Sequence, residues 1–244
     1  MADYSVPGLD KGLDVLQALA GHDGGLGQAE LARLVDRSVN EIFRVLATLE
    51  RRGWVLRDTQ TGLYEASTMM FQLAHRHPPL RSLVTAALGP MRRLNELTRQ
   101  SCNLAVLSQN RVLIVAQVES PGDFGFRVRV GAEFGVESTA TGAVLLAYAA
   151  AEVRAAYLMA EPNAPLEQRL PAVRRRGYSE ETDPLGGAIV DLVHPVLGPA
   201  GLVAALTVPY IATSYSTVSA EAVRGQTGAA AAEISLTLRP ERLR

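Results

Sequence analysis

Hydrophobic positions early in the chain recur at the spacing expected for two short helices. Apolar residues between positions 29 and 35 predict a helix that ends at the polar pair Asp36 and Arg37. A second helix is predicted to begin at Ser38, because Ser38 and Glu41 have the spacing of a capping box, in which each side chain satisfies an orphan N–H group of the first turn. The apolar positions of this second helix share one face: Val39, Ile42, Leu46 and Leu49.

A β-hairpin is predicted directly after the second helix. Gly53 stands where a helix commonly ends in the left-handed conformation. Residues 54–57 and 63–66 have the composition of strands and are separated by a polar turn at 58–62. This order is typical of a winged helix-turn-helix, in which the second helix fits the major groove and the hairpin reaches the phosphates or the minor groove.

Arginines give this segment a local basic stripe. Positions 33–57 carry six arginines against three acidic residues, although the rest of the first seventy residues cancels the excess charge. Specific binding would then depend on geometry and on the pairing of two copies. We expect these residues to contact DNA: Arg37, Ser38, Asn40, Arg44, Thr48, Arg57 and Thr61.

The rest of the chain predicts a linker helix followed by an α+β domain. A helix over 67–76 ends before two consecutive prolines, because a residue before proline avoids helical geometry. The next helix, 80–100, contains Gly89 and Pro90, which predict a kink or a break. Beyond it the hydrophobic period changes to two. Strands are predicted at 103–107, 112–118, 124–130, 189–196 and 202–208, and helices at 141–150, 151–159, 165–176 and 219–238.

These elements group into two domains. A first amphipathic helix, with leucines at positions 9, 13, 16 and 19, would form the base of the winged domain. We place a winged helix-turn-helix domain at 1–67, a linker helix at 68–79 and an α+β domain built on one antiparallel sheet at 80–244.

Composition excludes several classes of protein. The 244 residues, 48% of them hydrophobic, supply two modest cores, and a net charge of −1 argues against a general polyanion binder. A single cysteine, Cys102, excludes an intrachain disulfide and a cysteine-rich zinc site. The N-terminus lacks the features of a signal peptide, and the longest apolar stretch, 143–151, is too short to span a bilayer. We therefore expect a cytoplasmic protein that does not contact membranes.

Several motifs, taken in order, resemble those of one family. The segment from about 7 to 73, with E-L-A-R-L-V, S-V-N-E-I-F-R-V-L-A-T-L-E-R-R-G-W and D-T-Q-T-G-L-Y, resembles the winged domain of the IclR (isocitrate-lyase regulator) family of bacterial transcription factors. Further matches are T-A-T-G-A-V-L-L-A-Y at 139–148, R-R-R-G-Y-S at 174–179, G-G-A-I-V-D-L-V-H-P-V at 186–196 and G-L-V-A-A-L-T-V at 201–208. The resemblance implies that the second domain is GAF-like and binds a small-molecule effector.

The resemblance also implies where the effector lies. Carried over position by position, the implied contacts are Ala140, Thr141, Glu181, Asp191 and Thr207. The start of a helix offers free N–H groups, which suit an anionic or hydroxyl oxygen. The family commonly has a cysteine at position 191, so this chain would place two carboxylates in one pocket.

Two carboxylates affect the choice of effector. They would repel an anion unless one is protonated or an arginine such as Arg127 or Arg129 intervenes. We therefore favour a polyol, a sugar or another hydroxylated effector over a dicarboxylate. The alternative is that Glu181 is solvated in its loop and Asp191 forms a structural salt bridge.

Sequence motifs of catalysis are missing. There is no G-x-S-x-G elbow, Walker loop or H-E-x-x-H motif. His75 and His77 could ligate a metal with a distant third group, but such a pair at the end of a helix is more often surface. His194 is expected to be a hydrogen-bonded core histidine and Cys102 a small buried side chain. We expect no catalytic residues, no metal and no cofactor.

The sequence thus predicts an effector-responsive DNA-binding transcriptional regulator, a repressor of a catabolic operon. It would bind a palindromic operator as a homodimer or tetramer, because one recognition helix reads only a few base pairs. Two alternatives stay open. One is a protein–protein adaptor that docks through the helical hairpin, and the other is an enzyme built on the C-terminal α+β domain.

Overall fold

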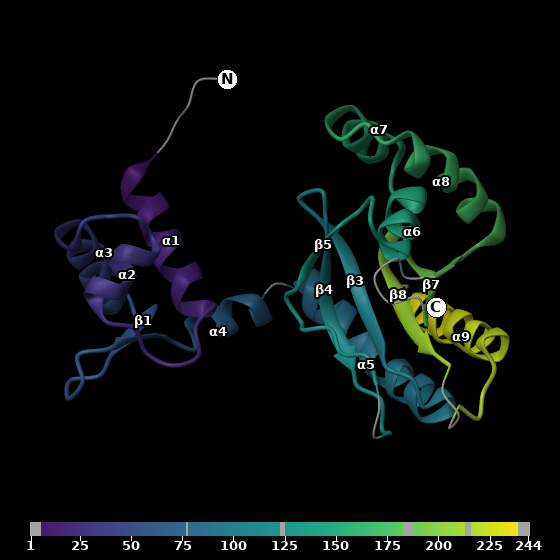
Figure 1. Cartoon of the computed structure of the whole chain (residues 1–244), viewed down its shortest axis with the longest axis horizontal. Helices are drawn as coiled ribbons and strands as arrows, with labels where there is room; N and C mark the ends of the chain where they lie inside the picture. Colours follow the sequence, from purple (N-terminus) through teal and green to yellow (C-terminus); the bar gives the residue numbers. More distant parts are fainter. Residues whose placement is uncertain (1–5, 77, 123–124, 183–187, 213–215, 239–244) are drawn as a thin grey trace, which may run out of the picture. The chain divides into compact units, whose positions relative to one another are not determined.

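Two compact units make up the protein. The computed structural model describes residues 6–76, 78–122, 125–182, 188–212 and 216–238. The chain divides into Met1–Arg81 and Ser82–Arg244 (Figure 1). No helix within the described ranges has the length and apolar character needed to cross a membrane.

The first unit is a helix-turn-helix with a two-stranded antiparallel wing. Its elements are α1 (Pro7–Ala20), α2 (Gln28–Leu34), α3 (Val39–Arg51), β1 (Val55–Arg57), β2 (Tyr64–Ala66) and α4 (Met69–Arg76). The core brings together Val15, Leu31, Ile42 and Leu46, all fully buried. Gly53 follows α3 with a φ of 75°, so the expected left-handed helix end is confirmed.

Two predicted packing stripes in this unit were right only in part, since Leu16, Leu19, Ile42, Leu46 and Leu49 belong to the core but Leu9, Leu13 and Val39 do not. On α1 the buried residues are Val15 and Leu19, whereas Leu9 and Leu13 are 58% and 50% exposed. The helix meets its neighbours along the Val15–Leu19 edge, so the leucines near its start lie outside the core. Val39 is 47% exposed, because the first residue of α3 lies beside the stripe of buried side chains and not within it.

The second unit is built on a six-stranded antiparallel sheet, so the α+β class is confirmed. The strand order is β5-β4-β3-β8-β7-β6. The strands are β3 (Cys102–Ser108), β4 (Arg111–Val118), β5 (Glu133–Gly135), β6 (Ser179–Thr182), β7 (Ile189–Gly198) and β8 (Gly201–Ile211). The helices are α5 (Pro78–Thr98), α6 (Ala140–Tyr148), α7 (Ala151–Ala160), α8 (Ala164–Arg176) and α9 (Ala220–Thr237).

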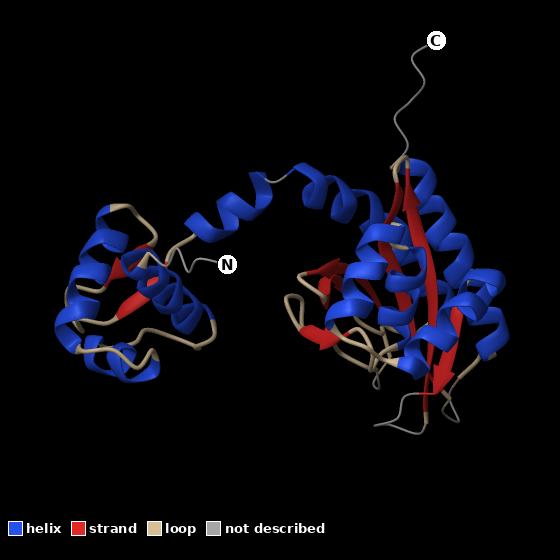
Figure 2. Cartoon of the chain, turned by 90° about the horizontal axis from the view of Figure 1, so that it is seen from above, coloured by secondary structure: helices blue, strands red, loops and turns tan. Residues whose placement is uncertain are grey.

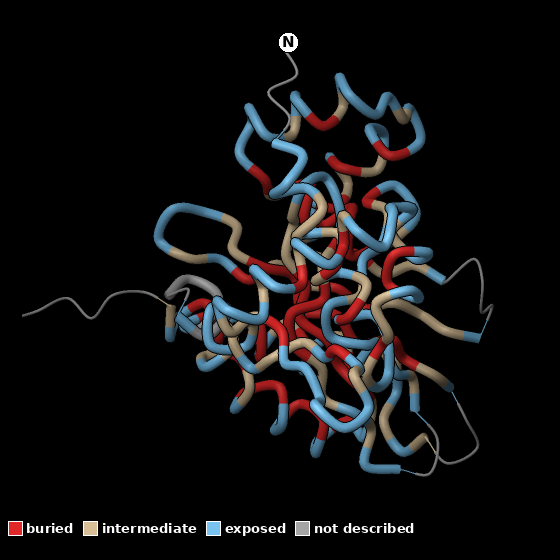
Figure 3. The backbone as a smooth tube through the Cα atoms, turned by 90° about the vertical axis from the view of Figure 1, so that its left-hand side faces the viewer, coloured by how far each residue is buried: buried red, intermediate tan, exposed pale blue. Residues whose placement is uncertain are grey.

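Helices cover both faces of this sheet (Figures 1 and 2). On β8, the side chain of Thr207 meets Thr141 of α6, with 2.8 Å between the two hydroxyl oxygens. Neighbouring residues of a strand point to opposite faces, so Leu206 and its partner His194 face away from α6. On that far side His194 lies against α9. Figure 3 colours the buried stretches of the chain red and the exposed stretches pale blue.

Helix α5 lies beside α9 on the face of the sheet opposite to α6. The Sγ of Cys102 lies 3.5 Å from a backbone carbonyl oxygen of α5, and an ion pair between Arg93 and Glu233 links the two helices. Helix α5 continues through Pro90 without the break that the sequence allowed.

The strand predicted at 124–130 was wrong for the residues that can be compared. Phe124 lies outside the described residues, and 125–130 form no strand. Along this segment Phe126 and Val128 are half-buried while Arg127 and Arg129 are exposed. The alternation is therefore real, but it arises from an extended segment lying against the core without a hydrogen-bonded partner strand.

At Gly228, α9 lies close to His194 of β7. A Cβ at Gly228 would lie 2.8 Å from Cε1 of His194, and the His194 ring stacks on Tyr178 with centroids 5.4 Å apart. An exposed Gly→Ala change in a helix usually stabilises a protein by about 1 kcal/mol. We expect Gly228→Ala to lower the free energy of unfolding instead, by about 1 to 3 kcal/mol, because the histidine must move.

Chemical denaturation followed by circular dichroism measures this effect, and α9 supplies a matched control. The Cβ position of Gly225 has no atom within 4 Å, so Gly225→Ala should be neutral or stabilising. Equal free energies of unfolding for the two variants would contradict the packing of α9 against His194.

Candidate DNA-binding and effector-binding faces

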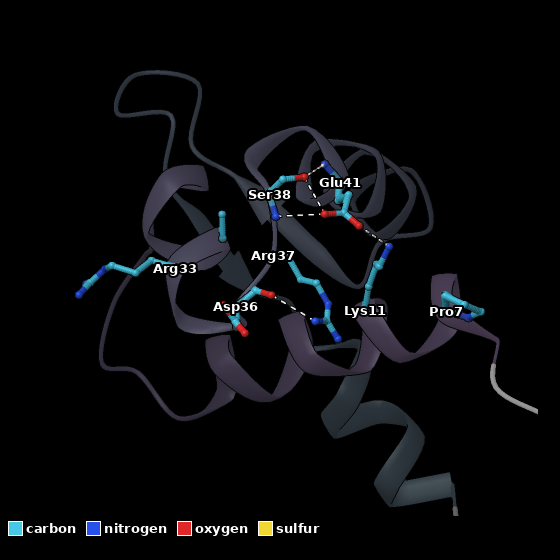
Figure 4. A pocket seen from close by; sticks show the side chains of 8 residues that line it. Pro7, Lys11, Arg33, Asp36, Arg37, Ser38 and Glu41 are labelled. Atoms are coloured by element: carbon cyan, nitrogen blue, oxygen red, sulfur yellow. Dashed lines mark hydrogen bonds and ion pairs between the residues drawn. The ribbon is translucent and has the colours of Figure 1, made fainter. Parts of the chain in front are cut away.

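The start of α3 is fixed by a reciprocal cap. The backbone N–H of Glu41 donates to Oγ of Ser38 at 3.4 Å, and the backbone N–H of Ser38 donates to Oε2 of Glu41 at 3.1 Å (Figure 4). The predicted capping box is thereby confirmed. The cap fixes the residue at which α3 begins.

Lys11 ties α1 to the same cap. Its Nζ lies 2.6 Å from Oε1 of Glu41. The hydrogen bond from Lys11, followed by those from Ser38, lowers the pKa of Glu41 from 4.5 to about 2. Lys11 is the only lysine in the chain, and here it holds the first helix against the start of α3.

This contact predicts a pH dependence of stability. The pKa of Glu41 is depressed in the folded state, so its contribution is present above pH 4.5 and is lost as the pH falls toward about 2. In Lys11→Gln we expect this loss of stability between pH 4.5 and 2 to be shallower, because the largest cause of the shift is gone.

Urea unfolding followed by Trp54 fluorescence measures this dependence, since Trp54 lies in the winged unit and is the chain's only tryptophan. Lys11→Arg keeps the charge and should behave more like the wild type. Identical slopes of stability against pH for wild type and Lys11→Gln would contradict the assignment.

The outward face of α3 is polar and basic. Ile42 and Leu46 point into the core, and the residues on the opposite side of the helix are exposed: Asn40, Arg44, Thr48 and Arg51. The hydroxyl of Thr48 donates to the carbonyl of Arg44 at 3.0 Å, so Thr48 is partly occupied by its own helix. Asn40 and Arg44 are free to approach a groove.

Arg37 lies in the turn before α3 and leans toward α1. Its Nη1 donates to the carbonyl of Asp36 at 3.1 Å, and its Nη2 lies 3.8 Å from Oδ2 of Asp14 (Figure 4). Arg33, by contrast, points away from this cluster in the same view. Arg37 is therefore held by the winged unit and would reach DNA only by leaving Asp14.

Asp58 orders the tip of the wing. Its carboxylate accepts hydrogen bonds from the backbone N–H of Gln60 at 2.7 Å and from the hydroxyl of Thr61 at 2.9 Å, which hold the pKa of Asp58 below its ordinary value. The guanidinium of Arg57 lies 5.4 Å from the centroid of the Tyr64 ring. Arg57 and Thr61 are both exposed, so the wing presents them to solvent.

An apolar groove lies in the winged unit beside α3. It has a volume of about 1390 Å³ and is formed by α1, α3, Trp54 and α4. Leu9, Leu13 and Leu73, which line it, are each at least half exposed. Arg44 and Thr48 also line it.

The start of α6 meets the middle of the sheet. Thr139 caps the helix by accepting the N–H of Gly142 at 2.9 Å. Ala140 and Thr141 are buried, and the hydroxyl of Thr141 bonds that of Thr207 on β8. The structure thus brings together three of the five predicted effector contacts.

The two predicted carboxylates lie side by side on β6 and β7, the two strands that follow β8 in the sheet. Glu181 on β6 is directly opposite Asp191 on β7. Glu181 forms an ion pair with Arg169 and accepts a hydrogen bond from Ser179 at 2.7 Å. Arg127, one of the two arginines that could have offset these acids, pairs with Glu119 at 2.9 Å.

Asn103 and Gln117 were missed by sequence reasoning. They lie directly opposite each other on β3 and β4, and Asn103 is also opposite Thr207. Their side chains therefore share the face of the sheet that α6 covers. The sequence signal that could have found them is an amide residue within an otherwise apolar predicted strand.

Cys102 is fully buried as expected, whereas His194 is half-buried and its shielded Nε2 has no hydrogen-bond partner among the described residues, so the expected hydrogen-bonded core histidine is not confirmed at that atom. Burial raises the pKa of the Cys102 thiol to about 12 and lowers the pKa of His194. Within the described ranges no three or more His, Cys, Asp or Glu side chains are grouped so as to hold a metal ion. His77, and the side chain of His75, lie outside the described residues.

Comparison with known proteins finds one family along the chain. Residues 8–59 match the IclR helix-turn-helix domain, and residues 80–236 match the bacterial transcriptional regulator IclR C-terminal domain. The regulator KdgR of Dickeya chrysanthemi is 27% identical over 212 residues, which are 82% of this chain and 69% of that protein. The glycerol operon regulatory protein of Streptomyces coelicolor is 28% identical over 79% of each chain.

Solved structures show the same fold. An IclR homologue from Microbacterium hydrocarbonoxydans, crystallised with 4-hydroxybenzoate, superimposes with a TM-score of 0.81 and 22% identity, covering 95% of this chain and 98% of the other. The two matched domains are those of DNA-binding transcriptional regulators with an effector-binding domain, and not of enzymes. The chain belongs to the IclR family of bacterial transcriptional regulators.

Proposed function

We propose that this regulator is a repressor of a catabolic operon, which acts in the bacterial cytoplasm on a palindromic operator. A small hydroxylated effector bound to the second unit changes its affinity for that operator. The observation that carries the proposal is the exposed face of α3, where Asn40 and Arg44 stand opposite the buried Ile42 and Leu46. Among relatives, AllR of Escherichia coli is named a transcriptional repressor.

The exposed face of α3 carries two residue types that recognise different bases. Arginine forms bidentate hydrogen bonds with guanine and asparagine with adenine in the major groove. We assign base contacts to Asn40 and Arg44, with Ser38 and Thr48 at the edges and Arg37 in the turn. Arg57 and Thr61 on the wing are assigned to the phosphate backbone.

Arg57 supplies a prediction that separates phosphate from base contacts. Arg57→Ala should weaken binding to all DNA sequences alike and lower the slope of log K against log salt concentration by about one unit. Fluorescence anisotropy measures this slope. The titrations use an operator duplex and a scrambled duplex at salt concentrations from about 50 to about 200 mM. Arg175→Ala removes the same charge from an exposed site on α8 and should leave the slope unchanged. An unchanged slope in Arg57→Ala would place Arg57 away from DNA.

A second copy of the chain is proposed to complete the DNA-binding unit. One recognition helix reads only a few base pairs, so useful affinity needs two half-sites. The half-exposed leucines of the groove between α1 and α4 support pairing, since contiguous exposed apolar surface commonly marks an interface. We propose a homodimer, or a tetramer formed from two such dimers.

The effector is assigned to the face of the sheet beside α6. The proposed contacts are the five that the family resemblance implies: Ala140, Thr141, Glu181, Asp191 and Thr207. A hydroxylated ligand suits the paired hydroxyls of Thr141 and Thr207. One relative is named for the glycerol operon, and the structural neighbour described above was crystallised with 4-hydroxybenzoate.

Binding to promoter DNA tests the proposal directly. The purified chain should shift a duplex that carries the promoter region next to its own gene, with dissociation constants of about 10⁻⁸ to 10⁻¹¹ M. A metabolite that stabilises the protein against heat should change that affinity. Failure to bind any neighbouring promoter, together with capture of a protein partner through α2 and α3, would favour the adaptor alternative.

A further inference from the structure

A row of polar side chains crosses the sheet beneath the start of α6. The register places Gln117 of β4 opposite Asn103 of β3, and Asn103 opposite Thr207 of β8. Directly opposed residues of antiparallel strands point to the same face, so all three share the face on which Thr141 meets Thr207. Asn103 and Thr207 are only 4% and 3% exposed.

The amide of Gln117 is buried without a partner. Within the part of the chain that the structure describes, neither Nε2 nor Oε1 of Gln117 forms a hydrogen bond, and both atoms are shielded from solvent. A buried donor or acceptor left unsatisfied is costly, and native structures contain few of them. A side chain that retains both an orphan donor and an orphan acceptor on a ligand-binding face is suited to a ligand that satisfies both.

The carboxylates on the β7–β6 side of Thr207 already have partners within the protein. Glu181 is held by Arg169 and by Ser179, and Asp191 also has a partner within the protein. The unsatisfied hydrogen-bonding capacity therefore lies on the β3–β4 side of Thr207, away from the two acids.

We propose that Gln117, with Asn103 beside it, forms the polar end of the effector site and hydrogen-bonds a hydroxyl group of an uncharged ligand. The inference rests on the proposed function, which assigns an effector to this face, and adds two residues and a ligand charge to it. A hydroxyl group both donates and accepts, so it can satisfy Oε1 and Nε2 together. The residues of the row, Gln117, Asn103, Thr207 and Thr141, are all neutral, so no cation among them selects an anion.

Stability of the full-length protein without ligand gives the first test. Gln117→Leu removes both orphan atoms, and we expect the melting temperature to rise by about 2 to 12 °C. Gln100→Leu is the matched control, because the Gln100 amide is satisfied by the backbone of Ile211, at 3.3 Å to the carbonyl and 3.2 Å to the N–H. That variant should melt at a lower temperature. A fall in both variants would overturn the inference, since Gln117 would then be an ordinary structural glutamine.

Titration with small polyols gives the second test. The side-chain amide signals of Gln117 are assigned in a ¹⁵N-labelled protein by their loss in Gln117→Leu. Glycerol, erythritol and xylitol are then added separately, with sodium acetate as the anionic probe. We expect saturable shifts of the Gln117 signals with at least one polyol and none with acetate. Shifts with acetate alone, or with none of the four, would overturn the assignment of an uncharged hydroxylated ligand.

The same samples separate this inference from the proposed function. Operator affinity of the wild type is measured without any polyol. If the operator is bound while the Gln117 signals do not move, only the assignment of Gln117 fails. If no operator is bound, the proposed function fails, whatever the amide signals show.

Discussion

Gly142→Ala is expected to lower the free energy of unfolding of the second unit by about 3 kcal/mol, because the methyl group has no room. A Cβ at Gly142 would lie 2.2 Å from the backbone oxygen of Val136. That oxygen belongs to the main chain and cannot rotate away. The N–H of Gly142 is also the group that the cap residue Thr139 binds, so displacing the glycine disturbs the start of α6.

Two probes separate the affected unit from the other. Far-ultraviolet circular dichroism follows all helices, and its transition should shift by about 6 to 12 °C. Trp54 fluorescence reports on the winged unit, and we expect its transition to stay near that of the wild type. Gly225→Ala, on α9 with open space at its Cβ position, provides the reference for a harmless change. A Gly142→Ala transition no lower than this reference would contradict the close contact with Val136.

Local signals in the sequence located most helix ends. The cap at Ser38 and the glycine end of α8 depend on residues within four positions of each other, and Gly177 has the left-handed φ of 86°. Strands were harder to predict, because pairing decides them. Strands β5 and β6 have three and four residues, too few for a period, and each exists because a longer neighbour bonds it.

The polar row of the effector face could not be placed by counting along the sequence. From the hairpin at Ser108 and Arg111, regular pairing would put Asn103 opposite Ala116. A bulge between Leu104 and Ala105 moves the register by one residue, so that Asn103 meets Gln117. Because β4 carries one extra residue at the bulge, the side chain of Gln117 points to the face of the sheet that α6 covers. Without the bulge it would point to the opposite face.

Sequence reasoning also could not decide what the acidic residues bind. The pairing of Glu181 with Asp191 across β6 and β7 agrees with the prediction that they lie together. The partner of Glu181 is Arg169 of α8, twelve residues away along the chain and close only because α8 returns to the sheet through Gly177. Such a contact depends on tertiary packing, which the hydrophobic pattern does not report.

Arg44→Ala is expected to weaken operator binding by roughly tenfold to a hundredfold, the equivalent of about 1 to 3 kcal/mol. Arg44 is exposed on the side of α3 opposite Ile42 and Leu46. A long guanidinium in this position can reach the edge of a guanine through two hydrogen bonds. Its loss should also relax the preference for one base pair in each half-site, because the lost contact reads a base and not the backbone.

Arg44→Lys distinguishes base reading from charge. Lysine keeps the positive charge but loses the two-pronged geometry of the guanidinium. We therefore expect this variant to bind scrambled DNA as the wild type does, with the same dependence on salt, while its preference for the operator falls almost as far as in Arg44→Ala. Anisotropy titrations against the operator, its single-base variants at each half-site position and a scrambled duplex measure all three quantities. If Arg44→Lys retains the full preference for the operator, Arg44 contributes charge alone, and the base contacts of α3 must come from Asn40 and its other exposed residues.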